Sequence, residues 1–137
     1  MKTFRVIIHE SFEDDTIKEI VFINQNIEQI LTLIEKLNGK SWVYLEIYYS
    51  SSPYHSLYII GGPDMFSFSL RMSKNKWVEK KYNPDHSPSW RTFGLGYHNY
   101  EADEYELCDL TTTKKVVQHF CSTGEWLTSI PSSIKEF

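Results

Sequence analysis

The segment from Met65 to Met72, MFSFSLRM, alternates apolar and polar residues along almost its whole length. Successive side chains of a β-strand point to opposite faces of the sheet, so this alternation predicts a strand with one buried face. Four apolar side chains are expected on that buried face: Phe66, Phe68, Leu70 and Met72. The polar residues between them would face solvent. A strand buried on one face only is typical of antiparallel sheets.

Apolar runs bounded by turn residues predict further strands, at residues 4–9, 18–23, 42–49, 57–60, 76–82, 93–97 and 104–107. A helix is predicted between the second and third of these runs. It begins at Asn24 or Asn26, which can cap its N-terminus, and it ends at Asn38-Gly39. Its apolar stripe has helical spacing and consists of Ile27, Ile30, Leu31, Ile34 and Leu37.

A second helix is predicted over residues 109–121, with Asp109 or Thr111 as its cap and Gly124 at its end. The strands cluster between the two helices and do not alternate with them. This order indicates an α+β fold, with a single antiparallel, meander-like β-sheet and two helices packed against it. With 41% hydrophobic and 23% charged residues and no visible linker or repeat, residues 1–137 are interpreted as one domain.

The composition argues against several classes of protein. No apolar run reaches the roughly 18 residues of a membrane span, and the N-terminus lacks the pattern of a signal peptide, so a cytoplasmic protein is expected. The two cysteines, Cys108 and Cys121, form no CxxC pair and are interpreted as buried thiols.

A catalytic or metal site is not expected either. The best metal-like set, Asp85, His86 and His98, lacks a further ligand and is interpreted as loop residues. No GxSxG or HExxH motif is present, and Cys121 at a helix C-terminus is poorly placed to ionise. The chain is therefore predicted to have no enzymatic activity and no cofactor.

Charge is distributed unevenly along the chain. An acidic stretch interleaved with tyrosines contains Tyr97, Tyr100, Glu101, Asp103, Glu104 and Glu106, and the first turn contains Glu13, Asp14 and Asp15. Carboxylates and exposed tyrosines suit a protein partner with a basic surface, although a solvated acidic hairpin is an alternative interpretation. The basic residues of 71–81 are too few in an acidic chain, of formal net charge −4, to predict nucleic-acid binding.

The order of several short motifs resembles one known family. A strand ends in Gly61-Gly62, and a final helix ends at Phe120, before Thr123-Gly124-Glu125 and a closing segment that begins at Trp126. This arrangement is similar to the first-numbered Imm family of immunity proteins, from bacterial polymorphic toxin and contact-dependent inhibition systems. The likeness covers roughly residues 40–134.

The resemblance implies that the chain is a cytoplasmic antitoxin. It would bind the catalytic domain of a cognate secreted toxin, of the nucleic-acid deaminase or nuclease kind, and cap its active site. The motif residues would be structural, with Trp126 and Ile130 folding back over the core. The acidic stretch with its tyrosines is therefore the predicted toxin-binding surface, and Glu13, Asp14 and Asp15 of the first turn are a weaker second patch. The chain would be a monomer or a weak homodimer, without a membrane or nucleic-acid partner.

A small-ligand-binding domain is the alternative. Such a domain would use an aromatic face of the sheet that is predicted to contain Trp42, Tyr44, Tyr48 and Trp77.

Overall fold

The computed structural model describes residues 2–49, 53–80, 89–95, 97–103 and 107–136. Its strands are β1 (Phe4–Ser11), β2 (Ile17–Gln25), β3 (Trp42–Tyr48), β4 (Ser56–Gly61), β5 (Phe66–Ser73), β6 (Lys76–Lys80), β7 (Trp90–Leu95), β8 (His98–Asp103) and β9 (Ser132–Glu136). The helices are α1 (Ile27–Glu35) and α2 (Leu110–Thr123). The predicted α+β class is confirmed.

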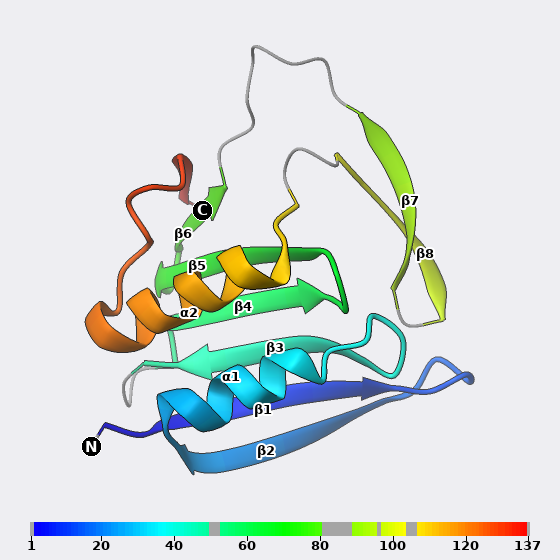
Figure 1. Cartoon of the computed structure of the whole chain (residues 1–137), viewed down its shortest axis with the longest axis horizontal. Helices are drawn as coiled ribbons and strands as arrows, with labels where there is room; N and C mark the ends of the chain where they lie inside the picture. The colour runs from blue at the N-terminus through cyan, green and yellow to red at the C-terminus, as the bar shows by residue number, and fades with distance from the viewer. Residues whose placement is uncertain (1, 50–52, 81–88, 96, 104–106, 137) are drawn as a thin grey trace.

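Seven strands form one antiparallel sheet in the order β2-β1-β3-β4-β5-β6-β9. The central run from β3 to β6 is a meander, as predicted. Strands β7 and β8 pair with each other in a separate two-stranded ribbon, and Figure 1 shows this ribbon to one side of the main sheet. The sheet therefore carries the core, and the ribbon is an appendage to it.

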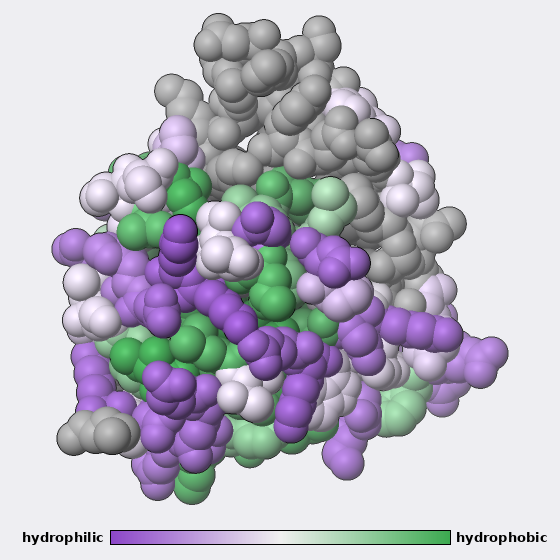
Figure 2. Space-filling model, viewed as in Figure 1, coloured by the Kyte–Doolittle hydropathy of each residue, from purple (hydrophilic) through white to green (hydrophobic). Residues whose placement is uncertain are grey.

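Both helices cover the same face of the sheet (Figure 1). Asn26 caps α1: its side chain accepts from Gln29 N, and the Gln29 side chain accepts from Asn26 N. Asp109 caps α2 by accepting from Thr112 N at 2.7 Å. The buried core lies between the helices and the sheet, and it includes Ile30, Ile34, Leu45, Ile59, Phe66, Leu70, Val117 and Phe120. Hydrophilic residues cover much of the outer side of the helix layer (Figure 2).

The closing segment packs on the core. Gly124 ends α2 with φ +74°, and its N–H donates to Phe120 O at 2.7 Å. Trp126 lies 5.4 Å from Phe68 between ring centroids, and its Nε1 donates to Ile130 O. The Thr123-Gly124-Glu125 turn and Trp126 are thus structural parts of the helix end and of the core's cover.

Some predicted details are wrong. The strand predicted over 93–97 does not continue to Tyr97. Strand β7 ends at Leu95, which pairs with His98, and Tyr97 lies in the turn between β7 and β8. Met72 is 39% exposed, since the pairing of β5 with β6 shifts register between Arg71 and Ser73 and the alternation of side chains is broken there. The first helix ends before the predicted Asn38-Gly39, because the last residue of α1 is Glu35.

Strand β9 was not predicted, because the polar sequence Ser132–Glu136 has no β pattern of its own and is held by pairing with β6. The strand predicted over 104–107 lies mostly outside the described residues. Among the described residues, no helix is long and apolar enough to cross a membrane.

Candidate functional site

One end of the molecule is built around the turn that joins β1 to β2. Glu13, Asp14 and Asp15 lie in this turn with exposed side chains, and Phe12 beside them is 40% exposed. Asp14 Oδ1 accepts hydrogen bonds from Thr16 Oγ1 (2.6 Å) and Thr16 N (3.1 Å). These bonds favour the carboxylate form and lower the pKa of Asp14 below its usual range. The turn therefore presents fixed negative charge to solvent.

The loop between α1 and β3 lies against this turn. Asn38 Oδ1 organises the loop by accepting from the backbone N–H groups of Lys40, Ser41 and Trp42, at 2.9–3.1 Å. Ser41 O in turn accepts from Ser11 N at 2.7 Å, which joins the loop to the end of β1. A hollow of about 220 Å³ opens here, lined by Lys36, Asn38, Ser41 and Trp42.

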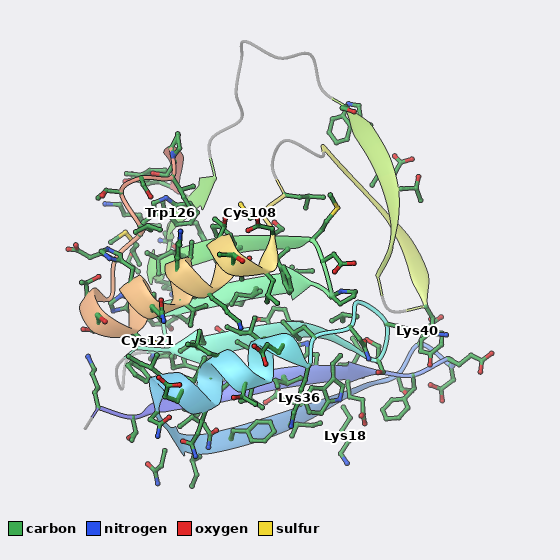
Figure 3. All side chains as sticks on the ribbon, in the orientation of Figure 1. Lys18, Lys36, Lys40, Cys108, Cys121 and Trp126 are labelled. Atoms are coloured by element: carbon green, nitrogen blue, oxygen red, sulfur yellow. The ribbon has the colours of Figure 1, made fainter. Side chains whose placement is uncertain are left out.

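The tip of the β7–β8 ribbon reaches the same end of the molecule (Figure 1). Lys40 lies beside this tip (Figure 3), and its Nζ is 5.5 Å from the centroid of the Tyr97 ring. Tyr97 is 42% exposed, and Glu101 on β8 is exposed opposite Thr92 on β7. At the far end of the ribbon Trp90 is 67% exposed. The ribbon thus offers aromatic and acidic side chains to a partner.

The structure brings part of the acidic stretch close to the first turn. Glu13, Asp14, Asp15 and Tyr97 are exposed at this end, where the loop after α1 contacts both β1 and the ribbon tip, and they form one candidate surface. Glu101 is exposed further along the ribbon, opposite Thr92, and is counted with this surface. We call it the acidic end. Tyr100 and Asp103 lie on β8, but their side chains, and all of Glu104 and Glu106, are outside the described part of the structure.

Sequence reasoning missed two residues: Trp90 at the far end of the ribbon and Lys40 beside its tip. Trp90 directly follows the polar, proline-containing loop of residues 83–89, and a tryptophan in that setting is an available signal of an exposed aromatic. Lys40 had no signal, because only the folded chain brings it to the ribbon 57 positions away (97 − 40).

The second candidate is the sheet face opposite the helices, where a carboxylate lies beneath tyrosines. Glu46 is only 5% exposed, and its carboxylate accepts from Tyr44 (3.1 Å), Tyr48 (2.9 Å) and Ser56 (2.8 Å). Ring contacts continue from Tyr44 to Tyr58 and then to Trp77, at 5.6 and 5.1 Å. This network satisfies a buried charge and fixes the rings in place.

The predicted aromatic face needs one correction. Tyr44, Tyr48 and Trp77 belong to it, but Trp42 packs against the core on the helix side and donates from Nε1 to Glu10 Oε2 at 3.0 Å. The reason is a shift of register between β1 and β3, where His9 pairs with Tyr44 but Glu10 pairs with Trp42. The extra residue reverses the alternation of side chains.

The network around Glu46 predicts a loss of stability in alkali. Burial, together with the Glu46 hydrogen bond and charge, raises the pKa of Tyr48 to about 12, and raises those of Tyr44 and Tyr58. The folded state therefore holds these protons more tightly than the unfolded state, whose tyrosines titrate near 10. The stabilisation is complete below about pH 10 and is lost as the pH rises through about 12.

Urea midpoints of the native chain and of Glu46→Gln, measured from about pH 9 to pH 11, check this. The native midpoint should fall with pH more steeply than that of Glu46→Gln, in which the negative charge is gone. Tyr97→Phe, which removes an exposed hydroxyl, should leave the native slope unchanged. Equal slopes in the native chain and Glu46→Gln would contradict the assignment.

Cys121 is buried, and this burial raises the pKa of its thiol to about 12. Cys108 is half-buried and forms an isolated bridge with Phe66 through backbone hydrogen bonds. Among the described residues, no group of three or more His, Cys, Asp or Glu side chains could hold a metal ion. Asp85 and His86 of the metal-like set lie outside those residues, as does the side chain of His98.

No family model matches the chain, and none of the curated proteins compared with it gives a match.

Proposed function

We propose that this chain is an antitoxin that acts by binding, without catalysis. It would bind the catalytic domain of a cognate bacterial toxin in the cytoplasm and cover the toxin's active site. The observation that carries the proposal is the β7–β8 ribbon, which exposes Trp90, Tyr97 and Glu101 and whose tip, with Tyr97, lies near the acidic turn of β1 and β2. Tryptophan and tyrosine anchor many protein interfaces, and surrounding charge speeds the encounter.

The ribbon supports binding because of its construction. A two-stranded ribbon has little stability of its own in water, and this ribbon pairs with no strand of the main sheet among the described residues. A partner that packs on Trp90 and Tyr97 would bury apolar surface that the ribbon now exposes. A toxin that acts on nucleic acid needs a basic cleft, and the negative charge of the acidic end is complementary to such a cleft.

Co-expression tests this proposal. The C-terminal domain of the protein encoded immediately upstream would be produced with this chain, with a tag on only one of the two. We expect a stoichiometric complex, together with relief of the toxicity that the upstream domain causes alone. An upstream domain that is harmless alone and does not co-purify with the chain would count against an antitoxin role.

Within such a complex, Trp90→Ala is expected to weaken binding by about 10- to 100-fold, mainly through faster dissociation, because it truncates an exposed aromatic anchor. Trp77→Ala is the matched control, since Trp77 lies on the open sheet face. Surface plasmon resonance of the two variants, after their melting temperatures are measured, makes the comparison. A large effect of Trp77→Ala with none of Trp90→Ala would move the interface to the open face, where the small-ligand alternative also lies.

A further inference from the structure

Strand β2 is one end of the seven-stranded sheet, and among the described residues it pairs only with β1. Its regular part is bounded on both sides by residues with positive φ, Asp15 at +69° and Asn24 at +55°. Asn24 lies where the pairing with β1 shifts register, which is the pattern of a β-bulge. Residues 17–23 therefore form a regular edge of seven residues, and the backbone groups on its outer side have no strand partner within the described structure.

Between its bounding residues this edge has few of the features by which proteins usually discourage pairing. It contains no proline and no glycine, and its only charged residues are Lys18 and Glu19. Three apolar residues on it are exposed: Ile17 (63%), Val21 (51%) and Ile23 (65%). Apolar residues also reach the surface along the side of the molecule where β2 lies (Figures 1 and 2). A long, apolar and unpaired edge is a template for adding another strand.

We propose that the added strand is β2 of a second copy of this chain, in an antiparallel pair with Ile20 opposite Ile20 at a two-fold axis. The edge is symmetric about Ile20, with three residues on each side in the 17–23 stretch. In this register Ile17 of each copy lies opposite Ile23 of the other. The two most exposed isoleucines of the edge then cover each other, as cross-strand pairs do in an antiparallel sheet.

The dimer leaves the ribbon accessible. A two-fold axis perpendicular to the sheet places the helix layers of both copies on the same side and extends one sheet to fourteen strands (7 + 7). In Figure 1 the ribbon lies away from the β2 edge, so Trp90 and Tyr97 of each copy stay free. One dimer could therefore bind two partner molecules, one at each acidic end.

Light scattering of the purified chain, from about 10 to 200 µM, tests the proposal without any partner. The mass is expected to rise with concentration from that of a monomer to twice that value. A mass that stays monomeric up to about 200 µM overturns the proposal.

Two double variants test the register, and both change only exposed side chains. Ile17→Lys/Ile23→Lys places like charges opposite each other and is expected to raise the dimer dissociation constant at least about tenfold. Ile17→Lys/Ile23→Glu places opposite charges in the same two pairs and is expected to retain the dimer. Circular dichroism and melting temperature verify that both variants fold. If both variants dimerise as tightly as the native chain, the interface is overturned. If both dimerise more weakly than the native chain and to the same extent, the pairing of Ile17 with Ile23 is overturned.

Discussion

Replacing Gly62 by alanine is expected to lower the free energy of unfolding by about 3–5 kcal/mol. Gly62 has φ +103°, a conformation that residues with a side chain rarely adopt. A Cβ atom at this position would lie 2.1 Å from Leu37 O and 2.6 Å from Leu37 C. Both atoms belong to the backbone that follows α1, where Leu37 is fully buried, so neither can move aside without displacing the core.

Thermal and urea unfolding of Gly62→Ala would measure this loss, and a fall in melting temperature of roughly 10–20 °C is expected. Asp64→Ala is the matched control, because Asp64 is an exposed residue of the same turn. The control should change the free energy of unfolding by less than about 0.5 kcal/mol. A Gly62→Ala variant as stable as this control would show that the turn does not pack closely on the end of α1.

Truncation of Phe120 to alanine is expected to cost about 3–5 kcal/mol of stability. The ring is fully buried and packs 5.5 Å from Tyr49 and 5.8 Å from His55, between ring centroids. His55 Nε2 also donates to Gly124 O at 2.7 Å, so this cluster fixes the C-terminal end of α2 to the chain before β4. Removing the phenyl group leaves a cavity at a junction of two segments that are distant in the sequence.

Urea unfolding of Phe120→Ala, Phe120→Leu and Gln118→Ala would test this. Phe120→Leu should cost less than about 1.5 kcal/mol, because it keeps most of the volume, and the exposed Gln118 should tolerate alanine. At temperatures where Phe120→Ala is still folded, it should bind the partner as the native chain does. Loss of binding by a folded Phe120→Ala variant would contradict a purely structural role for this motif.

Local chemistry made several elements of this fold predictable. The alternation around Phe66, Phe68 and Leu70 identified β5, and these three side chains are buried as expected. The sequence limited each helix cap to two residues, Asn24 or Asn26 and Asp109 or Thr111, and the structure shows Asn26 and Asp109 as the caps. The end of α2 at Gly124 was predictable because glycine adopts the left-handed backbone conformation that often ends a helix, and few other residues do. The α+β class followed from the order of these elements.

The tertiary structure alone decided how distant segments meet. The turn at Tyr97, the bulge that places Trp42 on the helix side and the pairing of β9 with β6 all depend on partners far away in the sequence. The acidic end depends on such partners as well, since it joins the first turn, the loop after α1 and the ribbon tip. The sequence by itself determined the elements and the acidic and aromatic residue types, because those depend on neighbours a few positions apart. Which of these residues share a surface depends on packing summed over the whole chain, and only the folded structure decided it.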